Sequence, residues 1–275
     1  MMNNTSYHSQ SQGLDLSRFQ AINAVSEKAD LSSKYSFIPT TTVINAFAQK
    51  GWMPVKASEV RCLKEERKGF QKHLIRFRQE NSIAVLDEVH PEIVLTNSHD
   101  GLASFQIMAG LFRLVCLNGL VVADSTFAKH SIRHMGYTDQ AVHLAIEELS
   151  DSIPMITNKV KDFKEIELTK NEKGIFAAAA LTMKYGENAL DERDFDIDNL
   201  TAPVRRADTD PTLWAGFNTI QEKFIRGGRF EKKTSDYGFK HTVKARGTKN
   251  INEDIRINRG LWLLTEKMAE LKKAA

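Results

Sequence analysis

This 275-residue sequence has only two cysteines and no long apolar run. Its two cysteines, Cys62 and Cys116, have no partners at metal-binding spacing, which excludes a disulfide framework and is typical of a reducing cytosol. No apolar run approaches the roughly 18 to 20 residues that cross a bilayer. The start, MMNNTSYHSQSQG, has neither the basic nor the apolar region of a signal peptide. We therefore expect a cytoplasmic protein without a membrane contact.

The motifs of the common enzyme classes are also missing. There is no G-x-S-x-G elbow, no phosphate-binding loop, no dinucleotide-binding glycine pattern and no H-E-x-x-H helix. This excludes the usual hydrolases, nucleoside triphosphatases, dehydrogenases and zinc proteases. The sequence therefore favours a role without catalysis and without a cofactor, although an enzyme of unfamiliar type stays open.

Two histidines offer the one candidate metal site. His130 and His134 stand four residues apart, which places them on one helix face and makes half of a site. A third ligand would come from His99, Asp100 or Cys116. The basic residues beside the two histidines would repel a cation, so we expect no metal. The same histidines with Asp100 are where an unfamiliar enzyme would have its site.

Composition and periodicity predict the fold class. Hydrophobic residues make up 41% and charged residues 27% of the chain, as in globular proteins. Residues 1–13 are polar and are predicted to form a flexible arm, with residues 14–275 forming a single α+β domain. Alternating apolar residues between about 55 and 125 predict a mostly antiparallel central sheet. Asn118-Gly119 predicts a tight turn within it.

The C-terminal half, about 138–275, is predicted to be largely helical and to pack on the sheet. A heptad pattern from Val142 to Phe163 predicts one kinked helix or two consecutive helices, because Pro154 interrupts it. Thr169 and Glu172 form a capping box for the next helix. Residues 187–199 are acidic and are interpreted as an exposed linker.

Arg205 and Arg206 lie beside Asp208 in the sequence, which leaves two interpretations open. Paired guanidinium groups bind phosphate as a fork, or they form a buried ion-pair anchor at the start of the following helix. The second interpretation is favoured.

Basic residues gather in two segments, although the formal net charge is only +3. The residues that we expect to contact an anionic partner on the first segment, a predicted strand face, are Lys68, Lys72, Arg76 and Arg78. Those on the second, a glycine-rich loop, are Arg226, Arg229, Lys232, Lys233, Lys240, Lys244 and Arg246. Basic side chains neutralise phosphates. The alternative is a charged surface hairpin.

Aromatic residues are interleaved with the second basic segment. Phe230, Tyr237 and Phe239 are candidates for stacking on unpaired bases. In the alternative interpretation these rings merely pack inward.

Four stretches of the sequence resemble a known family. They are DGLASFQIMAGLFRLVCLNGL, IRHMGY, LTAPVRRADTDPTLWAGFNTIQEKFIRGG and INEDIRINRGLWLLTEKMAEL, in this order. Together they resemble the bacterial domain-of-unknown-function family 932, also called phage/plasmid-like protein, over about residues 37–271. The resemblance implies a protein of plasmids, prophages and integrative elements, in the bacterial cytoplasm. It implies no activity and no catalytic residues.

These observations favour a nucleic-acid-binding accessory protein of a mobile genetic element, with DNA recombination or replication as the expected process. Single-stranded DNA is the preferred partner, because stacking requires unpaired bases. The alternative is an interaction or inhibitor protein that presents its basic face to an acidic host protein. The sequence leaves a homo-oligomer open.

Overall fold

The computed structural model describes residues 14–80, 82, 89–114, 118–121, 130–132, 138–235 and 237–274. The chain divides into two compact units. Unit 1 comprises residues 1–112 and 125–154, and unit 2 comprises residues 113–124 and 155–275. The predicted arm at residues 1–13 lies outside the described residues. That residues 14–275 form a single domain stays a prediction.

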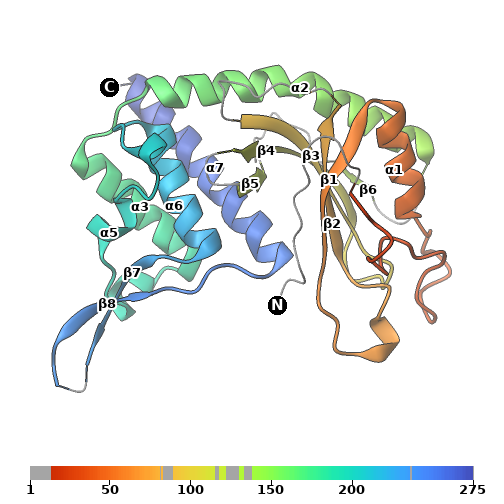
Figure 1. Ribbon diagram of the computed structural model, residues 1–275, viewed down its shortest axis with the longest axis horizontal. Helices are drawn as coiled ribbons and strands as arrows, with labels where there is room; N and C mark the ends of the chain where they lie inside the picture. Colours follow the sequence, from red (N-terminus) through yellow and green to blue (C-terminus); the bar gives the residue numbers. More distant parts are fainter. Residues whose placement is uncertain are drawn as a thin grey trace. The chain divides into compact units, whose positions relative to one another are not determined.

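Unit 1 is built on an antiparallel sheet (Figure 1). Its strands β1 (Trp52–Glu59), β2 (His73–Gln79), β3 (Val89–Asn97) and β4 (Phe105–Arg113) lie side by side in chain order. The short strand β6 (His130–Ile132) pairs with β4. The β1–β2, β2–β3 and β4–β6 pairs are antiparallel. The prediction of a mostly antiparallel sheet is therefore confirmed.

The apolar alternation along β2 places Ile75 and Phe77 on the sheet face that helix α1 (Thr40–Gln49) covers. The rings of Phe47 and Phe77 stack with their centroids 4.0 Å apart, and both side chains are fully buried. Burial of one such side chain stabilises the fold by about 1.5–3 kcal/mol. The helix starts after Pro39 and ends before Gly51, which adopts a positive φ of 76°.

One open alternative is decided by the structure, and one element differs from its prediction. The interrupted heptad pattern forms one helix, α2 (Asp139–Glu165), with Pro154 inside it, which agrees with the first of the two predicted alternatives, and the boundary between the units falls at that proline. Asn118 and Gly119 belong to strand β5 (Asn118–Val121), so the predicted tight turn is wrong. Strand pairing outweighs the local turn preference of an Asn-Gly pair at this position.

Unit 2 is largely helical, as predicted. Its helices are α3 (Lys170–Tyr185), α4 (Ala189–Glu192), α5 (Ile197–Thr201), α6 (Leu213–Arg226) and α7 (Ile251–Ala274), with the 3₁₀ turn η2 (Arg206–Asp208). The predicted capping box starts α3. Helix α6 packs on α7, where Phe217 and Trp262 meet edge to face. Within the described ranges, no helix has the length and apolar content needed to cross a membrane.

One buried and one partly exposed ion pair hold the loop before α6 in place. Arg113 and Asp208 lie 2.8 Å apart, and each side chain is only 1% exposed. Arg205 donates from Nε and Nη2 to Glu222 at 3.1 and 2.5 Å. Arg205 therefore anchors the loop to α6, as the second interpretation expects, but its partner is Glu222 and its side chain is 36% exposed.

Replacing Asp208 with Asn should lower the free energy of unfolding by about 3–5 kcal/mol, because it leaves the buried charge of Arg113 uncompensated. The matched control is Glu270→Gln, which removes the exposed pair of Glu270 with Lys267 and should cost at most about 1 kcal/mol. Urea unfolding of both variants measures the difference. Equal losses in the two variants would contradict the assignment.

Candidate nucleic-acid interface

The first basic segment is largely neutralised by its own carboxylates. Arg76 and Arg78 of β2 both bind Glu92 of β3, at 2.9 and 2.8 Å. The side chain of Arg76 is 3% exposed and that of Glu92 is 1% exposed. The guanidinium of Arg78 also lies 4.8 Å from the centre of the Phe112 ring. These arginines do not form the exposed basic strand face that the sequence predicts, because the face is buried.

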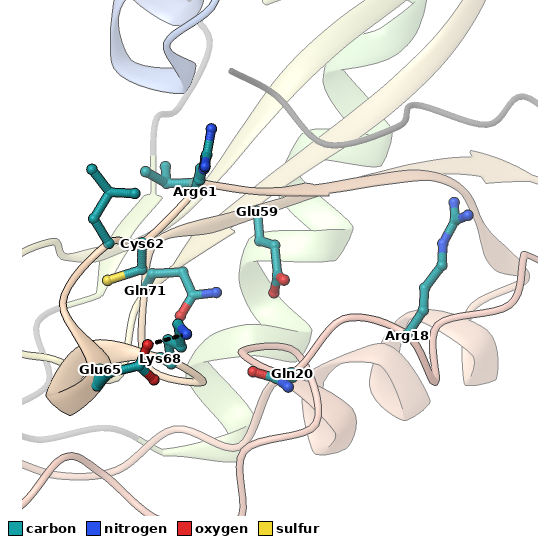
Figure 2. Close-up of a pocket in the computed structure, with 10 residues that line it drawn as sticks. Arg18, Gln20, Glu59, Arg61, Cys62, Glu65, Lys68 and Gln71 are labelled. Carbon is teal, nitrogen blue, oxygen red and sulfur yellow. Dashed lines mark hydrogen bonds and ion pairs between the residues drawn. The ribbon is translucent and has the colours of Figure 1, made fainter.

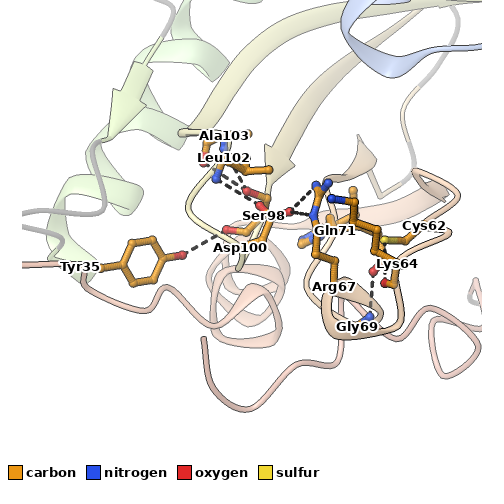
Figure 3. Close-up of polar contacts among 11 residues, drawn as sticks. Tyr35, Cys62, Lys64, Arg67, Gly69, Gln71, Ser98, Asp100, Leu102 and Ala103 are labelled. Carbon is orange, nitrogen blue, oxygen red and sulfur yellow. Dashed lines mark hydrogen bonds and ion pairs between the residues drawn. The ribbon is translucent and has the colours of Figure 1, made fainter. Parts of the chain in front are cut away.

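The remaining cations of this segment lie on and after the 3₁₀ turn η1 (Glu65–Arg67). Lys68 is half-exposed and forms an ion pair with Glu65. Arg67 donates from Nε and Nη2 to Asp100 at 3.1 and 2.7 Å (Figure 3). Lys72 is partly buried immediately before β2. The segment therefore offers little uncompensated charge.

The second basic segment forms a two-stranded hairpin in unit 2. Strands β7 (Arg229–Thr234) and β8 (Lys240–Lys244) pair in antiparallel register, with Lys233 opposite His241. Figure 1 shows the hairpin extending away from α6 and α7. At its tip Gly238 donates its N–H to the carbonyl of Ser235 and adopts a φ of 82°, a conformation that favours glycine.

Two of the three predicted stacking rings are exposed at this tip. Tyr237 is 87% exposed and Phe239 is 75% exposed. The backbone N–H of Phe239 donates to the side-chain oxygen of Ser235, which fixes the start of β8. Phe230 is fully buried against Phe224, with ring centroids 5.9 Å apart. The prediction that Phe230 stacks on bases is therefore wrong, because the hydrophobic core takes its ring.

An acidic segment docks along β7. The N–H of Lys232 donates to the carbonyl of Asp194 at 2.7 Å, and the N–H of Asp196 donates to the carbonyl of Phe230 at 2.8 Å. Most described residues of the segment 187–199 are exposed, as expected, but the segment does not run free as a linker. The stretch contains α4 and α5 and adds backbone hydrogen bonds to the hairpin.

The carboxylates of this segment pair with one face of the hairpin. Lys240 donates to Asp194 at 2.7 Å, and this hydrogen bond lowers the pKa of the Asp194 carboxyl. Lys232 lies 3.9 Å from Asp196, whose pKa is also lowered, chiefly by the N–H of Asn199. Side chains alternate between the two faces of a strand, so Lys233 and His241 lie on the opposite face.

The hairpin keeps a set of cations that its own carboxylates do not neutralise. In the described part of the chain, no carboxylate lies within ion-pair distance of four exposed basic residues: Arg229, Lys233, Lys244 and Arg246. Arg226, the last residue of α6, is also exposed. The hairpin thus combines two exposed rings with uncompensated positive charge.

Two of the candidate enzyme residues, His99 and Asp100, are buried in a polar cluster of unit 1. The Thr40 hydroxyl lies 2.8 Å from Nε2 of His73 and 3.3 Å from Nε2 of His99, and all three side chains are fully buried. Burial lowers the pKa of His73 to about 3, so this imidazole stays neutral. Asp100 is held by Arg67. The cluster therefore packs the strand ends and presents no described side chain to solvent.

The structure does not describe the other candidate metal ligands. Cys116 and His134 lie outside the described residues, as does the side chain of His130. The residues that are described contain no group of three or more histidine, cysteine, aspartate or glutamate side chains arranged to hold a metal ion.

Comparison with known proteins finds a matching family and similar proteins. A family model described as "Domain of unknown function (DUF932)" matches residues 16–262. The UPF0380 proteins YafZ and YfjQ of Escherichia coli (strain K12) are each 32% identical over 237 residues, which cover 86% of this chain and 83% of each relative. No solved structure matches the chain.

Proposed function

We propose that this chain, which belongs to the family of unknown function DUF932, binds single-stranded nucleic acid through its β7–β8 hairpin. One observation carries the proposal: exposed aromatic rings and uncompensated cations lie on the same hairpin. Tyr237 and Phe239 are at its tip, and Lys233 and Lys244 are on its two strands.

The two kinds of side chain supply the two interactions that such binding needs. Lysine and arginine neutralise backbone phosphates and release condensed counterions, which makes affinity depend on salt. Exposed rings stack on bases at about 1–3 kcal/mol per base. Stacking of this kind requires unpaired bases, which favours a single strand over a duplex.

The wider role that we propose is that of an accessory protein of a plasmid, prophage or integrative element in the bacterial cytoplasm. The phage/plasmid-like resemblance of the sequence supports it. DNA recombination or replication is the proposed process, because mobile elements commonly keep genes for both. This support is an association with such elements and does not come from the chemistry of the site.

The double variant Lys233→Ala/Lys244→Ala should weaken binding and its salt dependence. Each phosphate contact to a single strand contributes about 0.7 to the slope of log affinity against log salt, so loss of two contacts should flatten the slope by about 1.4. Fluorescence anisotropy with a labelled oligothymidine, repeated from low to high salt, measures both quantities.

The matched control is Lys267→Ala/Lys273→Ala. It removes the same charge from exposed lysines of α7, each paired with a carboxylate at 2.7 or 2.8 Å. It should leave the slope close to that of the unmodified protein. The same flattening in both double variants would show that only net charge matters, and the hairpin assignment would then be wrong.

Removing the exposed rings should reduce affinity without changing the salt slope, because no charge is lost. Tyr237→Ala and Phe239→Ala should each lower affinity by about fivefold to a hundredfold for a single strand. The control Tyr237→Phe keeps the ring and should retain most of the affinity. If the alanine variants bind as tightly as the unmodified protein, the rings do not stack on bases.

The docked acidic segment predicts a gain of affinity. Asp194→Asn removes the charge that neutralises Lys240, so this lysine becomes available to a phosphate. Because the pair is exposed and worth at most about 1 kcal/mol, the expected gain is up to about fivefold. Asp191→Asn makes the same charge change in the same segment, where Asp191 has no described cation partner. An equal gain in both variants would contradict the local pairing.

The exposed tip also favours a second candidate function, binding to an acidic host protein. Aromatic residues and arginine are enriched at protein interfaces, and the hairpin region exposes two rings together with Arg229 and Arg246. Pull-down from bacterial lysate with and without nuclease separates the two functions. A partner lost on nuclease treatment and with Lys233→Ala/Lys244→Ala supports nucleic acid, whereas an acidic protein retained after nuclease supports the second candidate.

A further inference from the structure

Unit 1 contains a cavity of about 500 Å³, and no residue of the β7–β8 hairpin lines it (Figure 2). Its walls come from the segment before α1, the end of β1 with the residues that follow, and the loop that carries η1. The volume lies within the roughly 300–1,000 Å³ that small-ligand sites occupy. The lining residues used below are Arg18, Glu59, Arg61, Cys62, Lys68 and Gln71.

The loop wall of the cavity is held in place before any ligand arrives. Arg67 on η1 binds Asp100, whose other carboxylate oxygen accepts the N–H of Leu102 at 3.1 Å. Within the loop, Oε1 of Gln71 accepts the N–H of Gly69 at 2.8 Å (Figure 3). Such preorganisation reduces the entropy that binding would otherwise cost.

The floor presents an acceptor and a donor. Glu59 is partly buried, and one of its oxygens accepts the N–H of Ala21 at 3.2 Å. Burial raises the pKa of this carboxyl. Its second oxygen has no hydrogen-bond donor among the described residues. Gln71 is only 5% exposed. Its amide oxygen accepts the N–H of Gly69, and its amide NH₂ has no acceptor among the described residues.

The rim carries basic side chains. Lys68 forms an ion pair with Glu65, and the guanidinium groups of Arg18 and Arg61 lie among the other lining residues. Figure 2 shows Arg18 and Arg61 as extended side chains on either side of Glu59. Planar guanidinium groups match the geometry of phosphate oxygens. A ligand that satisfies this cavity therefore carries an anionic group together with N–H donors and a neighbouring acceptor.

We propose that the cavity binds a nucleoside monophosphate, with guanine as the base that matches best. The phosphate lies at Arg61 on the rim. The adjacent ring N–H and amino group of guanine donate to Glu59, and the carbonyl oxygen of guanine accepts from Gln71. A nucleoside monophosphate also suits a cavity of this volume. This site does not depend on the hairpin, which belongs to unit 2.

Cys62 provides a readout on the unmodified protein. It is a free, partly buried cysteine that lines the cavity, so a bound nucleotide should slow its alkylation. The experiment measures the rate of iodoacetamide modification at Cys62 by peptide mapping, with guanosine monophosphate, adenosine monophosphate, guanosine or inorganic phosphate present. Protection by guanosine monophosphate at lower concentration than by the other three is expected. Absence of protection by guanosine monophosphate, or equal protection by guanosine, overturns the proposal.

Variants assign the two ends of the ligand. Glu59→Gln keeps an acceptor for Ala21 but loses the charge, so the dissociation constant for guanosine monophosphate should rise about tenfold. Arg61→Ala should weaken both guanosine monophosphate and phosphate. The control is Lys64→Ala, which removes an exposed cation of the same loop that does not line the cavity. Circular dichroism confirms folding, and equal effects of all three variants contradict the site.

The source of the nucleotide is tested in the Lys233→Ala/Lys244→Ala background, where binding through the hairpin should be weakened. Protection of Cys62 by a 5′-phosphorylated oligonucleotide that begins with guanine assigns the cavity to a strand end. Protection by free guanosine monophosphate alone assigns it to a free nucleotide. Both results support the cavity as a nucleotide site, and neither depends on the outcome for the hairpin.

Discussion

Glu92 binds the guanidinium groups of both Arg76 and Arg78 on a buried face of the sheet. A buried arginine needs a carboxylate close by, because an uncompensated charge away from water costs several kcal/mol. The same requirement accounts for Arg113 with Asp208. Arginines paired in this way are buried, although a count of basic residues in the sequence would place them on the surface. What the protein offers an anionic partner is therefore the set of cations that remain unpaired.

The β7–β8 hairpin keeps such a set because the carboxylates of its acidic partner segment pair with Lys232 and Lys240 and not with the four exposed cations named above. Asp194 and Asp196 approach Lys240 and Lys232, and they dock through backbone hydrogen bonds as well as through charge. The buried ring of Phe230 fixes the base of the hairpin in the core of unit 2. The exposed tip is thus carried by a rigid base, which is the arrangement that lets surface rings bind without a large ordering cost.

Sequence patterns predicted the elements that depend on neighbouring residues. Thr169 and Glu172 lie three residues apart and cap α3 through local hydrogen bonds, so their spacing is sufficient evidence. The alternation in β2 likewise predicted a strand. It did not predict that both faces of this strand are buried, because that depends on what covers the sheet.

The candidate site was predicted only in part, since its decisive contacts are distant in sequence. Asp194 and Lys240 are 46 residues apart, and no local pattern indicates that they meet. In the sequence, Phe230 and Phe239 both stand between basic residues. In the structure, however, Phe230 lies in the core and Phe239 is exposed to solvent. The cavity beside Glu59 gave no sequence signal, because its lining comes from three separated stretches.

Hydrogen exchange of the backbone amides, with and without a saturating oligothymidine, tests the central claim most directly. It reports on every segment of the unmodified protein in one experiment. The account predicts slower exchange in residues 229–246 and unchanged exchange in residues 68–78. Protection confined to residues 68–78, or none at a concentration where binding is saturated, would contradict the assignment of the interface to the hairpin.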